Sequence, residues 1–353
     1  MSRYFSQKYQ NLIPYTPGEQ PRDMQYIKLN TNESPFPPHK AVEQAVAGEA
    51  GLLQLYPDPT NRTLTEKVAE LTGVSPDEVL LTNGSDEVLN FAFMAFCDRE
   101  HPAVFPDITY GFYSVFAEIN GVPYTEIPLK EDFSIDPADY LHCGQTIFIA
   151  NPNAPTGLAL SVAQIEQIVQ QNPDNVVVID EAYVDFGAES CVPLTARYEN
   201  LLVTQTFSKS RSMAGARLGF GIGSKELIRD LNTIKYSTNP YNINRMTAAA
   251  GLATLEQNAE AMNNCRTICE NRTETMRALK ALGFAVTDSH TNFVFAKHPA
   301  MDGKTLYQKL KARGILVRHF DKPRIADYNR ITIGTAEQMQ TLVQTIREIL
   351  EEC

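Results

Sequence analysis

Short, wholly apolar runs alternate along the chain with longer stretches in which apolar residues recur every three or four positions. The runs are typical of strands buried on both faces, and the stretches are typical of helices with one buried face. This alternation predicts an α/β fold with a largely parallel sheet covered by helices. The strands predicted in this way fall at residues 79–82, 103–105, 146–150, 176–179 and 201–203, and a further strand is predicted at the more polar segment 123–127.

Signals for helix ends refine this pattern. Thr63-Leu64-Thr65-Glu66 fits a capping box and predicts the start of a helix, and similar boxes begin at Ser161 and Thr335. A short helix is predicted at residues 224–231. A long helix is predicted at residues 245–282, interrupted after its first third, and it is expected to connect two domains.

The chain divides into three predicted parts. Residues 1–30 are typical of an extended arm, because three prolines and a glycine between positions 14 and 21 interrupt any helix. The alternating strands and helices of residues 31–245 predict a large domain. Residues 246–353, with fewer and shorter apolar runs, predict a smaller α+β domain.

Composition and charge narrow the class of partner. The chain has 353 residues, 43% of them hydrophobic and 21% charged, with a formal net charge of -11. That charge argues against nucleic acid or an anionic membrane as the main partner. The polar start and the absence of any apolar stretch near 20 residues make the cytoplasm the default location. The six histidines and six cysteines show no metal-ligand spacing, so no metal site is predicted.

The candidate chemistry centres on a lysine. Lys209 follows a buried strand between two serines, and Arg217 follows eight residues later beside glycines. A lysine acts as a nucleophile when partial burial and a nearby cation favour its neutral amine. Hydroxyls and an arginine suit a phosphate. The stretch therefore indicates a lysine that forms an imine with a phosphate-bearing carbonyl cofactor; the alternative is a solvated surface loop without a function.

Two further groups follow strands of the same predicted sheet. Ser85 comes after Gly84 at a helix start, where amides and the helix dipole favour an anion, although most such serines only cap a helix. Asp180 ends a buried strand, where a carboxylate needs a partner. That partner is a protonated pyridine nitrogen, an Mg²⁺ ion shared with Glu181, or a salt bridge from a neighbouring strand.

A set of motifs in this order spans nearly the whole chain. The set resembles the fold-type-I pyridoxal-phosphate aminotransferases and, among them, the histidinol-phosphate aminotransferases. The resemblance implies a large domain with a mostly parallel sheet, a smaller α+β domain and pyridoxal 5′-phosphate as cofactor. The motifs are Gly84-Ser85-Asp86, Asn151–Gly157, Asp180–Tyr183, Ser208-Lys209 and Arg217, with Pro14-Tyr15, Leu29–Glu33, Leu55–Pro57, Thr109–Gly111 and Arg330–Thr335.

The resemblance also assigns roles around the cofactor. Lys209 is expected to be the imine lysine and to move a proton between the substrate Cα and C4′ of the cofactor. Asp180 is expected to pair with the pyridinium, and Tyr183 to donate to the ring oxygen. The other residues expected to bind the cofactor are Gly84, Ser85, Asp86, Tyr110, Thr206, Ser208, Arg217 and, from the other subunit, Tyr56.

One position departs from the family pattern. The family usually has an asparagine directly before Pro-Thr-Gly, where it donates to the ring oxygen, and this chain has Ala154 there. Either Asn153, one residue upstream, takes over this hydrogen bond or Tyr183 donates alone.

The same resemblance assigns the residues that bind the substrate. Arg330 is expected to clamp the carboxylate of an amino acid or 2-oxo acid, because a guanidinium binds a carboxylate through two parallel hydrogen bonds. Tyr15, Asn32 and Arg318 are expected to contact the rest of the substrate. The implied enzyme is a homodimer with shared active sites that exchanges an amino group between histidinol phosphate and 2-oxoglutarate in histidine biosynthesis. The alternatives are an aromatic amino-acid aminotransferase, a threonine-phosphate decarboxylase, or a catalytically silent binding protein.

Overall fold

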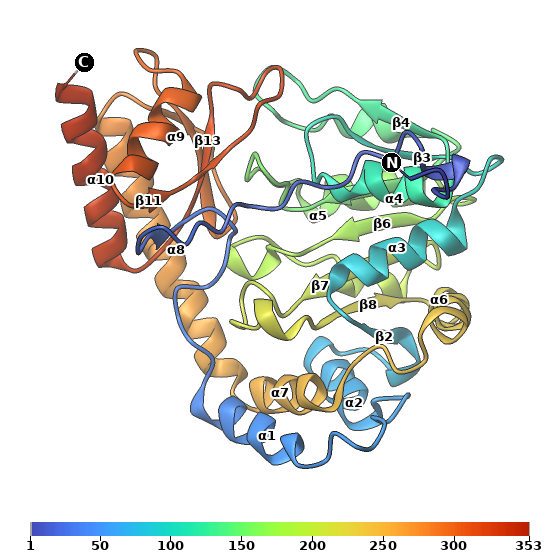
Figure 1. Cartoon of the computed structure of the whole chain (residues 1–353). Coiled ribbons are helices and arrows are strands. Elements are labelled where there is room, and N and C mark those ends of the chain that lie inside the picture. The colour runs from blue at the N-terminus through green and yellow to red at the C-terminus, as the bar shows by residue number, and fades with distance from the viewer. Residues whose placement is uncertain (1, 353) are drawn as a thin grey trace.

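The six predicted strands form, together with one strand that was not predicted, a seven-stranded sheet in the larger of two bodies (Figure 1). The computed structural model describes residues 2–352. The strand order is β2-β8-β7-β6-β5-β3-β4, and β8 alone runs antiparallel to its neighbours. The strands are β2 Val79–Thr82, β3 Ala103–Pro106, β4 Tyr124–Ile127, β5 Thr146–Ala150, β6 Val177–Asp180, β7 Leu201–Thr206 and β8 Gly219–Gly223.

Both faces of this sheet are buried along the six strands from β2 to β3, which explains why these strands are largely apolar. In β6, Val177 and Ile179 belong to the apolar core on one face, and Val178 belongs to the core on the other. The neighbouring β7 alternates in the same way over Leu201–Val203. The edge strand β4 is the exception, because its first three residues are exposed. The prediction of a mostly parallel α/β sheet is confirmed.

The helices lie in two layers. The layer formed by α3, α4 and α6 covers one face of the sheet, and the layer formed by α2, α5 and α7 covers the other, with α1 packed on α7. Their bounds are α1 Lys40–Ala50, α2 Arg62–Thr72, α3 Ser85–Phe96, α4 Phe112–Asn120, α5 Val162–Gln170, α6 Lys225–Thr238 and α7 Arg245–Glu256. Short 3₁₀ helices lie at Gln7–Tyr9, Pro76–Glu78, Pro137–Tyr140, Val184–Phe186, Val192–Ala196 and Ala214–Ala216.

The smaller body has its own apolar core. Its antiparallel sheet has the order β12-β13-β10-β9, and β1 pairs in parallel with β11 beside it. The long helix α8 and the final helix α10 lie side by side at its edge (Figure 1). The elements are β1 Ile27–Lys28, α8 Asn258–Ala281, β9 Ala285–Val286, β10 Phe293–Lys297, α9 Gly303–Ala312, β11 Ile315–Leu316, β12 Arg318–His319, β13 Asn329–Thr332 and α10 Ala336–Glu351.

Packing adds detail to the predicted domains. Helix α7 shares the core of the large sheet, whereas β1, near the end of the predicted arm, pairs within the smaller body. The boundaries predicted at residues 30 and 245 stay predictions. None of the helices within residues 2–352 combines the length and apolar character needed to cross a membrane.

The predicted helix starts are confirmed in two places and wrong in one. Capping boxes are present at Ser161 and Thr335. The box predicted at Thr63 is absent, because α2 begins two residues before its expected first residue, at Arg62. The Asp58 carboxylate accepts a hydrogen bond from the Arg62 amide at 3.2 Å and so stabilises the earlier start.

Strand β8 was not predicted, because glycines at every second position hide its apolar period. Those glycines are required where α3 crosses the strand. A Cβ atom at Gly219 would lie 2.3 Å from the amide nitrogen of Ser85, and one at Gly221 would lie 2.9 Å from a methyl group of Val88. The start of α3 therefore rests on bare backbone. The helix after β8, predicted to end at Leu231, continues through a further buried face to Thr238.

We predict that Gly219→Ala destabilises the protein by about 1–3 kcal/mol, because the new methyl group must push α3 away from β8. The midpoint of urea unfolding, followed by circular dichroism, should fall. Gly215→Ala is the control, since a Cβ atom there would have no heavy atom within 4 Å. Equal midpoints for the two variants would contradict the proposed contact.

Candidate active site

Side chains from the carboxyl ends of neighbouring strands meet in one cavity of about 120 Å³, here called the inner cavity. The strands β2, β5, β6 and β7 point the same way, so the residues that follow them gather at one edge of the sheet. The lining residues are Ser85, Asp86, Tyr110, Ala150, Ala154, Asp180, Ala182, Tyr183, Thr206, Ser208, Lys209 and Arg217.

A second cavity of about 580 Å³, the outer cavity, lies between the two bodies and adjoins the first. Four residues line both cavities: Tyr110, Ala154, Tyr183 and Lys209. The outer cavity is also lined by segment 13–18 of the arm and by residues that precede α1. A molecule in the inner cavity therefore lies directly beside one in the outer cavity.

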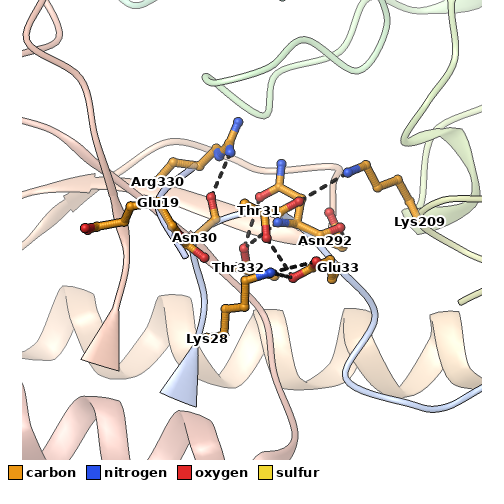
Figure 2. A network of polar contacts seen from close by, with 10 residues as sticks. Glu19, Lys28, Asn30, Thr31, Glu33, Lys209, Asn292, Arg330 and Thr332 are labelled. Carbon is orange, nitrogen blue, oxygen red and sulfur yellow. Dashed lines mark hydrogen bonds and ion pairs between the residues drawn. The ribbon is translucent and has the colours of Figure 1, made fainter. Parts of the chain in front are cut away.

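Lys209 is a partly exposed residue whose amine is enclosed where the two cavities meet. Its ammonium donates a hydrogen bond to the backbone carbonyl of Thr31 at 3.2 Å (Figure 2). Burial lowers the pKa of Lys209 to about 8, and the charge of Arg330 adds to this effect. A substantial share of the amine is therefore neutral near physiological pH, as a nucleophile requires.

Asp180 is buried on the wall of the inner cavity. Its carboxylate accepts hydrogen bonds from the Tyr113 hydroxyl at 3.1 Å and from the Ala182 amide at 3.2 Å. Burial raises the pKa of Asp180 to about 7, against the opposing effect of these two hydrogen bonds. Within residues 2–352, no lysine or arginine forms an ion pair with this carboxylate, so a salt bridge is not the partner that its burial demands.

Glu181, the residue that made a magnesium site conceivable, is turned away from the cavity. Its buried carboxylate is held by three protein donors, the Ser190 hydroxyl, the Cys191 amide and the Gln205 amide. Glu181 therefore stabilises the fold behind the site. A protonated ring nitrogen is the one partner of the three considered that this arrangement suits.

A cradle for an anion lies at the other end of the inner cavity. Gly84, and not Ser85, is the N-cap of α3, so the Ser85 hydroxyl is not used as a helix cap. The Ser208 hydroxyl accepts hydrogen bonds from Thr206 at 3.0 Å and from Arg217 at 3.4 Å, which leaves its own proton to donate. Helix amides, hydroxyls and a guanidinium together suit a phosphate.

The close approach of Arg217 requires glycine at position 84. Gly84 has φ +83°, and a Cβ atom there would lie 2.6 Å from Nη2 of Arg217. The same guanidinium donates to Asp86 at 2.9 Å, and Asp86 also accepts a hydrogen bond from the Tyr110 hydroxyl at 2.6 Å. Asp86 thus orients both the cation of the cradle and the aromatic ring above the cavity.

The inner cavity fits pyridoxal 5′-phosphate, the cofactor that the sequence implied. The cradle suits its phosphate, the unpaired Asp180 suits its ring nitrogen, and the amine of Lys209 suits its carbonyl. The fit depends on the buried carboxylate of Asp180, since no cation within residues 2–352 forms an ion pair with it.

Arg330 is buried on the wall of the outer cavity. One guanidinium nitrogen donates to the Asn30 carbonyl at 3.2 Å, and Nε has no partner. The guanidinium lies over the rings of Phe293 and Phe320, with its Cζ atom 5.3 and 5.6 Å from the two ring centroids. Within residues 2–352 it forms no ion pair with a carboxylate. A buried arginine in this state suits an anionic group of a substrate.

The other predicted substrate residues lie nearby. Arg318 donates to the carbonyls of Thr16 and Pro17, at 2.9 and 3.0 Å, and so holds the arm across the outer cavity. Tyr15 lines that cavity and stacks on Phe112, with ring centroids 4.2 Å apart. The side-chain amide of Asn32 donates to the Tyr183 hydroxyl at 2.9 Å, a contact that leaves the tyrosine proton free to donate.

Three predicted site residues line neither cavity, although the first of them, Gly84, lies beside Arg217 of the cradle. The other two are Asn153 and Tyr56. Asn153 donates to the Ile108 carbonyl and to Thr156, at 2.9 and 3.0 Å, and does not line the inner cavity. Of the two alternatives at the ring oxygen, donation by Tyr183 alone is the one that this geometry favours. Tyr56 is 77% exposed and lines neither cavity of its own chain.

Other residues of the site were not predicted. Tyr113 holds Asp180, and its position one helical turn after Tyr110 was an available signal. Lys322 adds a further cation to the outer cavity. Thr31 contributes a backbone carbonyl, which no pattern of side chains reports.

Comparison with known proteins agrees with this geometry. Residues 24–346 match the family described as aminotransferase class I and II. A histidinol-phosphate aminotransferase of Brachyspira hyodysenteriae is 48% identical over 353 residues, which cover 99% of this chain and 100% of that protein. One of Acinetobacter baumannii is 48% identical over 350 residues, 98% and 97% of the two chains.

Solved structures share the fold at lower identity. A histidinol-phosphate aminotransferase of Sinorhizobium meliloti, in complex with pyridoxal-5′-phosphate, has a TM-score of 0.89 at 23% identity and covers 99% of both chains. An L-threonine-O-3-phosphate decarboxylase of Porphyromonas gingivalis has a TM-score of 0.81 at 22% identity and covers 92% of this chain and 99% of that one. The fold alone does not choose between these reactions. The family match and the full-length relatives do identify the family: this chain belongs to the class I and II aminotransferases.

Proposed function

We propose that this protein is a pyridoxal-phosphate-dependent aminotransferase that exchanges an amino group between histidinol phosphate and 2-oxoglutarate, as a step of histidine biosynthesis. The observation that carries the proposal is a neutralisable buried amine, Lys209, that shares a cavity with the unpaired carboxylate of Asp180. The full-length relatives, at 48% identity, supply the choice of substrate.

Asp180 has an electrostatic duty in this proposal. Pyridoxal phosphate, when bound, draws electrons away from the substrate Cα into its protonated ring. Asp180 keeps the proton on the ring nitrogen, because a buried carboxylate with a pKa raised to about 7 is stabilised by a cation beside it. Tyr113 and the Ala182 amide hold the carboxylate in place.

Lys209 has two duties. Its neutral amine would condense with the cofactor carbonyl, with loss of water. When the substrate amine takes its place, the freed Lys209 amine would carry the proton between the substrate Cα and C4′. An amine with a pKa of about 8 is suited to both the uptake and the return of this proton, since the two steps have a similar free-energy cost near neutral pH.

The outer cavity recognises the substrates. Arg330, buried and without a carboxylate partner, binds the carboxylate of 2-oxoglutarate. Arg318 and Lys322 supply positive charge for the phosphate of histidinol phosphate, and Tyr15 supplies an aromatic face for its imidazole. Because both substrates must use one site in turn, the cavity needs separate cations for a carboxylate and a phosphate.

A homodimer with shared sites completes the proposal. Tyr56 stacks on Tyr241, with ring centroids 4.5 Å apart, and three exposed leucines lie just before it, at positions 52, 53 and 55. Exposed apolar side chains in one segment are typical of an interface. Tyr56 would then reach the cofactor phosphate of the partner subunit. The cytoplasm suits an enzyme whose described cysteines are all unpaired.

The substrate choice is tested by assaying the purified protein with histidinol phosphate, phenylalanine and phosphothreonine. We expect glutamate to form from 2-oxoglutarate fastest with histidinol phosphate. Faster turnover of phenylalanine would favour an aromatic aminotransferase, and loss of CO₂ from phosphothreonine would favour a decarboxylase.

We predict that Lys209→Ala abolishes turnover, a loss of at least about 10³-fold, because it removes both the nucleophile and the proton carrier. The visible absorption that pyridoxal phosphate acquires on covalent binding should be lost as well. Lys225→Ala, which removes an exposed lysine paired with Asp77, is the control. An unchanged visible band in the first variant would refute the assignment of Lys209.

We predict that Arg330→Lys raises KM for 2-oxoglutarate roughly 10–100-fold, because a charge-assisted hydrogen bond of about 1.5–3 kcal/mol is lost with the planar fork. Steady-state kinetics with varied 2-oxoglutarate measure the effect. Arg313→Lys, at a surface pair with Glu352, is the control and should leave KM unchanged.

We predict that Tyr56→Phe weakens retention of pyridoxal phosphate roughly 10-fold or more, through loss of a hydrogen bond to a charged group. In a mixed dimer, one subunit carries Tyr56→Phe and the other carries Lys209→Ala. If each site combines Lys209 of one subunit with Tyr56 of the other, one of the two sites is fully intact. Retention per dimer should then match that of one native site. Tyr241→Phe is the control, and retention no better than in Tyr56→Phe dimers would argue against shared sites.

A further inference from the structure

Three consecutive residues ahead of α1, at positions 30–32, contact three predicted site residues in succession. They reach Arg330, Lys209 and Tyr183 in that order, through two backbone carbonyls and one side-chain amide, at 3.2, 3.2 and 2.9 Å. Figure 2 shows the first two contacts. The position of this short segment therefore sets the position of the reactive groups.

An ion pair outside both cavities anchors the segment. The Glu33 carboxylate accepts a hydrogen bond from the Thr31 hydroxyl at 2.7 Å and two from the Lys28 ammonium at 2.7 and 2.6 Å (Figure 2). Lys28 belongs to β1, which is fixed to the smaller body by its pairing with β11. The side chain of Thr31 is thus held on one side while its carbonyl faces Lys209 on the other.

We propose that Glu33 is a positioning residue for Lys209, acting through Thr31 and through its own negative charge. The hydrogen bond to Thr31 keeps the carbonyl on the amine, so the amine stays aimed into the inner cavity. The negative charge of Glu33 favours the ammonium form of Lys209, and the positive charge of Lys28 partly cancels this effect. The inference rests on the proposed function in one respect, that Lys209 is the amine that reacts with the cofactor.

The ionisation of Glu33 supports this role. Burial pushes the pKa of Glu33 up, and the hydrogen bonds from Lys28 and Thr31 more than offset this, so its pKa lies below the usual value. Glu33 is therefore charged at neutral pH, and its charge opposes the effect of burial on the pKa of Lys209.

Other charges also face Lys209. The cations favour the neutral amine, and the carboxylates favour the ammonium. Among the charged groups around the amine within residues 2–352, the Lys28–Glu33 pair alone combines both signs at positions that line neither cavity. Each member of the pair can therefore be changed without altering a cavity wall. The charged and titratable groups around the amine are Arg330 of β13, Arg217 after the 3₁₀ helix at 214–216, Asp86 of α3, Asp180 of β6, Tyr183, and the Lys28–Glu33 pair.

The test follows capture of pyridoxal phosphate by the full-length chain freed of cofactor. The rate of capture, read from visible absorbance, rises with pH as Lys209 loses its proton. For Glu33→Gln, the midpoint of this rise should move down by about half a pH unit, because a charge that favours the ammonium is gone. For Lys28→Met the midpoint should move up by about as much, because Glu33 is no longer compensated.

A matched control separates this effect from general damage. Glu166→Gln breaks an ion pair with Arg197, at 2.7 Å, on the remote helix α5 and should leave the midpoint unchanged. Opposite shifts in the two test variants support the proposal. Midpoints equal to that of the control overturn it, and if Glu33→Gln does not fold, the direction of the Lys28→Met shift decides alone. Failure of the unaltered chain to capture the cofactor would instead refute the proposed function, and this inference with it.

Discussion

Two groups of opposite charge are buried in one cavity without forming an ion pair with each other. Burial moves both toward their uncharged forms, Lys209 to a pKa of about 8 and Asp180 to a pKa of about 7. Leaving such groups unpaired costs free energy. The protein offsets part of that cost with the carbonyl of Thr31 and the hydroxyl of Tyr113. The remainder is recovered only when a molecule that carries complementary groups occupies the space between them.

The sheet keeps these groups apart and aimed at the same space. Asp180 ends β6, and Lys209 follows the adjacent strand β7 after a short turn. Because the two strands are parallel and fully buried, the core fixes the backbone positions from which the two side chains extend. The cradle is fixed by a different means, since bare backbone at Gly219 lets the first turn of α3 rest directly on β8.

The sequence was sufficient for the features that depend on strong local patterns. Apolar runs predicted the parallel strands, and the residues that follow them predicted Ser85, Asp180 and Lys209 of the inner cavity. The resemblance to a known family supplied most of the other residues that line it. The sequence was insufficient where side chains carry no signal: β8 is hidden by its glycines, and Thr31 acts through its backbone. The choice between Asn153 and Tyr183 also lay beyond the sequence, because adjacency to Ala154 does not tell which way the loop turns the Asn153 side chain. Dimerisation and the division into domains remain predictions.

The pairing of β2 with β8 has a consequence for the order of assembly. In the sheet β2 has β8 as its neighbour, and the two strands are separated by well over a hundred residues of chain. During synthesis on the ribosome, the strand that emerges first must therefore wait until the rest of the sheet has been made. The anion cradle, which joins the start of α3 to Arg217, is among the last parts of the large body to form. A nascent chain can thus build most of its sheet before it is able to hold a phosphate.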